Sequence, residues 1–229
     1  MATNKQEDNR AESTRQDTLV LDKAKMERGL VALDEAMGKD LMIHAFSPIT
    51  MISPGGYIAV TYFENRISTE DIDVIIDPDY AGERDLLNLL RTTMMDVGDY
   101  LGYGKKWIND SVALFLTTPS RRSLFDDAKK QDIVLWSGEN LRVLAAPLEW
   151  GLESKLRRLS AKPNHPKRVT DMSDVLVLLN ALINKNKGAL NRDVVLGMNR
   201  NGFDLAIKEQ VLDQVAEEYE GQYGEKPFC

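Results

Sequence analysis

The chain has 229 residues and a formal net charge of −7; 43% of its residues are hydrophobic and 28% are charged. This length and composition are typical of a globular protein that builds one sizeable core. A general nucleic-acid binder needs a broad basic surface, so the acidic balance argues against general DNA binding, while a local basic groove stays open.

The first predicted elements are a tail and a helix. Residues 1–16 hold almost nothing that could be buried, so we expect a disordered tail there. Residues 17–39 follow a helical pattern, in which apolar residues recur at spacings of four, three and four: Met26, Leu30, Leu33 and Met37.

The next segment alternates strands with helices. The apolar run at 48–53 ends in Pro-Gly-Gly at 54–56, which predicts a buried strand that enters a tight turn. A short helix over 57–65 and a strand over 71–77 follow, and the strand is rich in β-branched residues. Apolar residues at helical spacing predict a further helix over 83–100.

Shorter strands then lead to a helical second half. We expect a strand over 111–116 and a hairpin formed by 133–136 and 141–145. Four helices are expected after Pro147, in the ranges 148–159, 171–184, 191–198 and 205–219.

This order of elements predicts an α+β fold with a small mixed β-sheet, flanking helices and a helical C-terminal part. The predicted organisation is a disordered tail at 1–16, a sheet domain at 17–146 and a helical part at 147–229.

Cysteine usage and hydropathy indicate the compartment. The single cysteine, Cys229, cannot form an internal disulfide or a cysteine zinc cluster, which suits a reducing compartment. The N-terminus lacks the apolar core of a signal peptide, and no apolar run is long enough to cross a bilayer. We therefore expect a cytoplasmic protein without a membrane partner, and a nuclear location stays open.

Gly55 and Gly56 stand between the predicted strand and the short helix. Two glycines at such a place let the backbone approach a ligand closely, and the start of the following helix suits a phosphate. A plain tight turn is the structural alternative.

Asp71 and Asp73 are two residues apart on a predicted strand. Side chains alternate along a strand, so both carboxylates point to one face, with their α-carbons roughly 7 Å apart. Two carboxylates on one face repel each other unless a cation lies between them, and magnesium prefers oxygen ligands and triphosphate oxygens. An ordinary solvent-facing strand edge is the alternative.

Together, the Gly-Gly turn, the short helix and the Asp-x-Asp strand resemble the signature of the nucleotidyltransferase superfamily, the DNA polymerase beta-like group. The arrangement of Arg66, Ser68 or Thr69, Asp71 and Asp73 looks most like the abortive-infection type branch. The resemblance spans residues 51–179 in order, because the family's later features have candidates in Asp132, Lys155 and the run Arg168, Asp171 and Asp174.

The resemblance implies a nucleotidyltransferase core and a role for each aspartate. Asp71, Asp73 and Asp132 would hold two Mg²⁺ ions, and Asp132 would help to deprotonate an attacking hydroxyl. Asp132 has a structural alternative as the end of a charged loop. Lys155 would reach the triphosphate of a nucleotide such as ATP, or else lie on a solvated helix face.

The remaining candidates also have two readings. Arg66 would contact phosphate or pair with Asp73, and Ser68 and Thr69 would bind phosphate or shape the loop. The run at 168–174 favours a salt-bridged helix start, capped by its first aspartate, over direct chemistry.

The implied function is a magnesium-dependent nucleotidyltransferase that moves a nucleoside monophosphate from a nucleoside triphosphate to a hydroxyl acceptor. The acceptor would be a small molecule, a protein side chain or a tRNA end, and the acidic chain makes tRNA the least favoured. The alternatives are a catalytically inactive relative that binds a nucleotide or a partner, and a structural partner that uses its helical C-terminal half for protein contacts.

Overall fold

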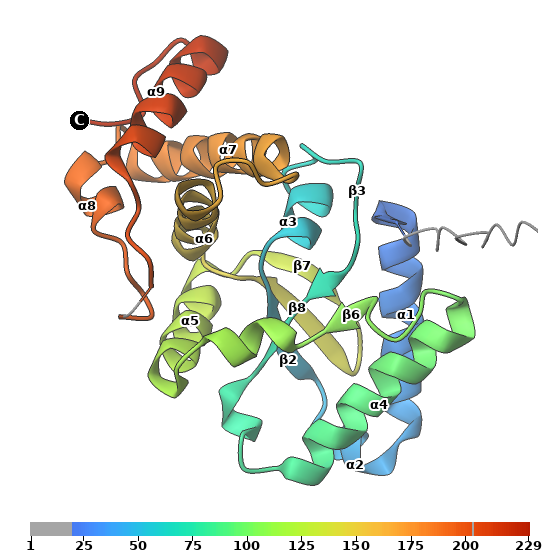
Figure 1. Cartoon of the computed structure of the whole chain (residues 1–229). Helices are drawn as coiled ribbons and strands as arrows, with labels where there is room; N and C mark the ends of the chain where they lie inside the picture. Colours follow the sequence, from blue (N-terminus) through green and yellow to red (C-terminus); the bar gives the residue numbers. More distant parts are fainter. Residues whose placement is uncertain (1–19, 203) are drawn as a thin grey trace, which may run out of the picture.

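A four-stranded sheet lies at the centre of the molecule, in the order β5-β2-β8-β7 (Figure 1). β2 (Ile49–Ser53) and β8 (Leu141–Ala145) run parallel in its middle, so their carboxyl ends meet at one edge. β5 (Ile75–Ile76) pairs antiparallel with β2, and β7 (Val134–Ser137) pairs antiparallel with β8. The sheet is therefore mixed, and the predicted hairpin is confirmed as β7 and β8. The computed structural model describes residues 20–202 and 204–229, and the predicted tail at 1–16 lies outside them.

Two short ladders flank this sheet. β1 (Leu21–Asp22) pairs antiparallel with β3 (Ser68–Thr69), and β4 (Ile72–Asp73) pairs parallel with β6 (Ile108–Asn109). The single strand predicted over 71–77 is wrong in this respect: it is split into β4 and β5. The chain changes partners between the two, because β4 pairs with β6 whereas β5 pairs with β2.

Three helices of the first half build a core against the sheet: α1 (Lys23–Lys39), α2 (Leu41–Ala45) and α4 (Arg84–Leu101). The predicted stripe on α1 is confirmed, because all four of its apolar residues are fully buried. The helix begins later than expected. Asp22 caps it by accepting a hydrogen bond from the Lys25 backbone N–H at 2.8 Å, so Leu21 and Asp22 belong to β1.

The strand predicted over 111–116 is wrong. Ser111–Phe115 forms a 3-10 helix, and Leu114 and Phe115 are 81% and 74% exposed. The apolar pattern misled because neither of these side chains contributes to the buried core. α5 (Thr118–Gln131) was not predicted, because its sequence is mostly polar; Thr117 caps the start of this helix.

The second half is helical, as expected. It contains α6 (Leu148–Ala161), α7 (Arg168–Asn186), α8 (Arg192–Leu196) and α9 (Glu209–Tyr223), and α3 (Gly56–Thr61) lies beside α6 and α7 in Figure 1. The α+β class with small sheets and flanking helices is thus confirmed. The domain division at residue 146 stays a prediction. Within the described residues, no helix is long and apolar enough to span a membrane.

Candidate functional site

The glycine turn follows directly from the end of β2. Gly55 has φ +75° and ψ −124°, a backbone conformation that only glycine adopts without strain. Gly56 is required for a different reason: a Cβ at this position would collide with the Thr69 side chain on β3. The two glycines therefore build a close approach between the turn and the segment that leads to the aspartates.

Replacing Gly56 by alanine is expected to lower the free energy of unfolding by roughly 1–3 kcal/mol, because the added methyl group has no room beside Thr69. Chemical denaturation would measure this change. Thr69→Gly in the same chain removes the colliding atoms, so the double variant should lose less than the two single losses combined. Gly82→Ala is the matched control, since a Cβ at Gly82 meets nothing within 4 Å. Equal effects of Gly56→Ala and Gly82→Ala would contradict this account.

Asp73 lies on β4 and Asp71 just before it, so the predicted alternation of burial is present although Asp71 lies outside the strand. Ile72 and Val74 are fully buried, whereas the two aspartates are only half-buried. Asp73 is also tied to the glycine turn, because the Ser53 hydroxyl donates a hydrogen bond to the Asp73 backbone carbonyl at 2.6 Å. The end of β2 thereby fixes the aspartates beside the turn.

Asn109 is a site residue that the sequence analysis missed. It lies opposite Asp73 in the β4–β6 ladder, and its Nδ2 donates a hydrogen bond to Asp71 Oδ2 at 3.2 Å. The sequence gives only a slight indication of this role: Asn109 is a polar residue that follows two apolar residues, Trp107 and Ile108, both buried in the structure. Asn109 holds Asp71 in place without adding a charge.

The two carboxylates are electrostatically unfavourable in this position. The pKa of Asp73 is raised to about 6. Burial is the largest cause and the neighbouring charge of Asp71 the second, while Lys155, Lys167 and Arg158 partly offset both effects. Burial also raises the pKa of Asp71, against the lowering effect of the hydrogen bond from Asn109. A bound cation would offset the cost of both charges, because it would stabilise the ionised form of each carboxylate.

Cations reach the pair from the second half of the chain. Lys155 and Arg158 come from α6, and Lys167 lies just before α7. Arg158 and Lys167 were not predicted as site residues. Their placement depends on the packing of α6 and α7, which local sequence spacing does not show.

A buried charge network surrounds Lys155. Its Nζ lies 3.2 Å from Asp171 Oδ1 and 2.7 Å from Asp174 Oδ2. Arg158 also pairs with Asp171, and Arg66 donates from Nε to Asp174 Oδ1 at 2.8 Å. Although burial raises the pKa of Asp171, its bonds to Arg158 and Lys155 hold that pKa below the usual value.

These contacts decide several of the open readings. Arg66 pairs with Asp174 rather than with Asp73, and Lys155 is buried rather than on a solvated face. Ser68 and Thr69 form β3, which pairs with β1, and phosphate binding by their hydroxyls stays a prediction.

The run at 168–174 differs from the predicted helix start. Asp171 lies in the first turn of α7 instead of capping it, and Arg168 donates to Gln214 rather than to an aspartate of that run.

Asp132 does not join Asp71 and Asp73. It follows the last residue of α5, its side chain is 66% exposed, and it pairs with Arg142 at 3.0 Å. Its φ of +51° belongs to a helix C-cap and not to the opening of a strand. Within the described ranges, no cluster of three or more histidine, cysteine or acidic residues could hold a metal ion.

The donor set nevertheless suits magnesium bound together with a nucleotide. Magnesium keeps several waters and is usually held by one or two carboxylates plus substrate phosphates, rather than by a cage of protein ligands. Asp71 and Asp73 supply two such carboxylates. In residues 20–202 and 204–229, no side chain donates a hydrogen bond to the Asp73 carboxylate. The pair therefore fits one metal–triphosphate group, while a second ion would lack the third carboxylate expected for it.

Comparison with known proteins gives one match. A family model described as "Domain of unknown function (DUF7582)" matches residues 67–226, which is more than half of the chain. The matched range includes the aspartate pair and the helices that carry the cations, and it begins after the glycine turn. Neither the curated proteins nor the solved structures include a match.

Proposed function

The chain belongs to the DUF7582 family, and we propose that it is a magnesium-dependent nucleotidyltransferase whose site is the segment 55–73. The observation that carries this proposal is the placement of Asp71 and Asp73 side by side, half-buried, next to an open glycine turn. A bound cation would offset the repulsion within the pair. Lys155, Arg158 and Lys167 lie near enough to act on Asp73 and would contact a triphosphate, although each of them also pairs with a carboxylate of the chain.

The proposed reaction transfers a nucleoside monophosphate. A hydroxyl oxygen of the acceptor forms a bond to the α-phosphorus, the bond from this phosphorus to the bridging oxygen breaks, and pyrophosphate leaves. The hydroxyl proton passes to water, because both carboxylates of the pair would be engaged in holding magnesium. Magnesium would neutralise the charge of the triphosphate. The acceptor is a small molecule, a protein side chain or a tRNA end, in a cytoplasmic setting.

Calorimetric titration with ATP, GTP, CTP and UTP in the presence of magnesium tests the site. We expect binding that depends on magnesium, and a loss of roughly tenfold or more in Asp71→Asn/Asp73→Asn, because both metal-binding oxygens of the pair are altered. Asp132→Asn is the matched control, expected to stay within about twofold, since Asp132 pairs with Arg142 away from the pair. Absence of binding in the wild-type protein would contradict the proposal.

A second function is favoured by the position of Asp132. Without a third carboxylate at the pair, the protein would bind a nucleotide and not transfer it, as a nucleotide- or partner-binding module. The two functions differ in pyrophosphate release. Incubation with α-labelled triphosphate and acceptor mixtures of RNA, protein and small metabolites should yield labelled product and pyrophosphate for the enzyme. Tight binding without either product would support the module.

A further inference from the structure

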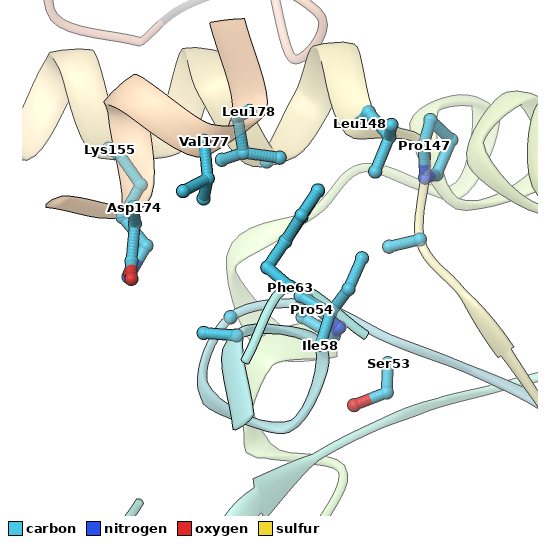
Figure 2. A pocket seen from close by; sticks show the side chains of 14 residues that line it. Ser53, Pro54, Ile58, Phe63, Pro147, Leu148, Lys155, Asp174, Val177 and Leu178 are labelled. Carbon is cyan, nitrogen blue, oxygen red and sulfur yellow. The ribbon is translucent and has the colours of Figure 1, made fainter. Parts of the chain in front are cut away.

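The pocket beside the glycine turn, between α3 and the α6–α7 pair, is too small to hold a large ligand (Figure 2). Its volume of about 20 Å³ is room for about one water. Its polar side chains lie at two separate ends, with Lys155 and Asp174 at one end and Ser53 at the other. A larger partner needs a different surface, and the pair formed by α7 and α9 provides one.

A groove of about 960 Å³ runs between the first half of α7 and the second half of α9, which lie side by side in Figure 1. We call it the α7–α9 groove. Its lining is Arg168, Val169, Met172, Ser173 and Leu176 from α7, and Gln214, Glu217, Glu218, Gly221 and Gln222 from α9. Both sets recur at helical spacing, so each wall is one continuous face of a helix.

An apolar seam of α7 runs into this groove and is covered along only part of its length. Its residues recur at spacings of three, four, three and four, the pattern with which one helix packs along another: Val169, Met172, Leu176, Leu179 and Ile183. The last three are 7% exposed or less and belong to the core cluster that also holds the buried face of α9. Met172 is only half-buried, and Val169 is 82% exposed. The seam therefore extends past the part that the described residues cover.

The α9 wall of the groove is acidic. The helix carries five carboxylates and no lysine, arginine or histidine: Glu209, Asp213, Glu217, Glu218 and Glu220. The one ion pair that α9 forms within the described residues uses Asp213, so Glu217 and Glu218 keep their charges available in the groove. Arg168 is the one cation among the described lining residues, and it donates to Gln214 Oε1 at 2.6 Å. Positively charged side chains on a docked helix would therefore meet two exposed carboxylates.

We propose that the α7–α9 groove binds an amphipathic helix of a partner protein, whose apolar face covers Val169 and Met172 and whose lysine or arginine side chains pair with Glu217 and Glu218. This inference does not rest on the proposed nucleotide site, because no lining residue of the groove belongs to the segment 55–73. The seam favours a helix over an extended peptide, since spacings of three and four match the side chains of a second helix. A second copy of the chain is disfavoured, because its net charge of −7 would meet an acidic wall.

Fluorescence anisotropy with synthetic helical peptides tests the groove. The lysine peptide is labelled, spans about three heptads, and carries leucine at the two seam positions of each heptad with lysine beside them. The comparisons are a peptide with glutamate in place of lysine, and a peptide of the same composition as the lysine peptide in scrambled order. The wild-type protein should bind the lysine peptide roughly tenfold or more tightly than either, because only this peptide offers both an apolar seam and complementary charge.

The apolar wall is tested by a substitution in the exposed part of the seam. Val169→Lys places a cation where the apolar face of the peptide would lie, and it should weaken binding of the lysine peptide roughly tenfold. Val194→Lys is the matched control, because Val194 is another exposed valine, on α8, and lies outside the groove lining. Its affinity for the peptide should stay within about twofold of the wild type.

The acidic wall is tested by charge reversal. Glu217→Lys/Glu218→Lys should weaken binding of the lysine peptide and strengthen binding of the glutamate peptide, each by roughly fivefold. Glu209→Lys/Glu220→Lys makes the same change of net charge on α9 outside the groove lining, so it should leave the preference for the lysine peptide in place. Every substituted side chain is exposed, and the circular dichroism of each variant should match that of the wild type.

Three results would overturn the proposal. The first is no binding of the lysine peptide to the wild-type protein, or equal binding of the lysine and scrambled peptides. The second is a charge preference that survives Glu217→Lys/Glu218→Lys. The third comes from sedimentation velocity of the protein alone: self-association that Val169→Lys removes would mean that the groove holds a second copy of the chain.

Discussion

Asp174→Ala is expected to lower the free energy of unfolding by about 3–5 kcal/mol, the largest effect of any single substitution considered for this protein. The Asp174 side chain is 4% exposed and accepts from Asn65, Arg66 and Lys155. Its removal leaves the guanidinium of Arg66 without its ion pair and takes one of two carboxylates from Lys155, with both cations nearly buried. An uncompensated buried charge is costly, because the interior solvates it poorly.

Urea denaturation monitored by circular dichroism would measure this loss. Asp174→Asn gives a second, milder test, because the amide still accepts hydrogen bonds but carries no charge. The free energy of unfolding of this variant should lie between those of Asp174→Ala and the wild type. Asp213→Ala is the control: Asp213 also pairs with an arginine, Arg192, but its side chain is 69% exposed, so the loss should stay below about 1 kcal/mol. A loss below 1 kcal/mol in Asp174→Ala would show that the network contributes little to the fold.

Asp73→Asn is expected to raise the free energy of unfolding, whereas Asp174→Ala lowers it. The same substitution should weaken magnesium-dependent nucleotide binding. The carboxylate of Asp73 is unfavourable in the folded state, which is why its pKa rises from 3.8 to about 6. An uncharged amide of the same shape removes this cost, so the variant should be more stable than the wild type at pH 7.5 by up to about 3 kcal/mol. Loss of function together with gain of stability is typical of a site that holds strained charges.

The sign of the pH dependence follows from this rise. Between pH 3.8 and about 6 the unfolded chain loses the Asp73 proton while the folded protein keeps it, so wild-type stability falls as the pH rises through this window. The stability gap between Asp73→Asn and the wild type should therefore be small below pH 3.8, grow up to about pH 6 and stay constant above it.

Thermal or urea denaturation at pH 4.5, 6 and 7.5 checks the pH dependence. The control, Asp96→Asn, removes the charge of an exposed aspartate on α4. Magnesium with triphosphate should raise the melting temperature of the wild type and of Asp96→Asn more than that of Asp73→Asn. A gap that does not change with pH would contradict the burial of the Asp73 charge.

The sequence determined the parts of the site that lie close together along the chain. The glycine pair between a strand and a short helix, and the alternation of Asp71 and Asp73 with buried Ile72 and Val74, depend on local rules of turn and strand geometry. The stripe on α1 and the helices of the second half followed from apolar spacing, which reports directly which face is buried.

Some elements escaped this reasoning because local pattern does not decide them. The run at 111–116 looks like a strand, yet no strand among the described residues pairs with it, and Leu114 and Phe115 remain exposed. The polar stretch at 118–131 looks like a loop, yet Leu124, Phe125 and Ala128 give it enough apolar surface to pack as α5. A strand needs a neighbouring strand to hydrogen-bond with, and a helix needs an apolar surface to pack against. Segments distant in the chain supply both.

Which charges meet at the site was decided by the tertiary structure alone. Asn109 reaches Asp71 from β6, across 38 residues of chain. The charges of Lys155 and Arg158 act on Asp73 from α6, although Asp73 lies far earlier in the chain. The same packing leaves Asp132 outside, where it ends α5 and pairs with Arg142. Periodicity along the chain reports which residues are buried. The side chains that come together depend on how helices and sheets pack, and that packing is set by the whole core.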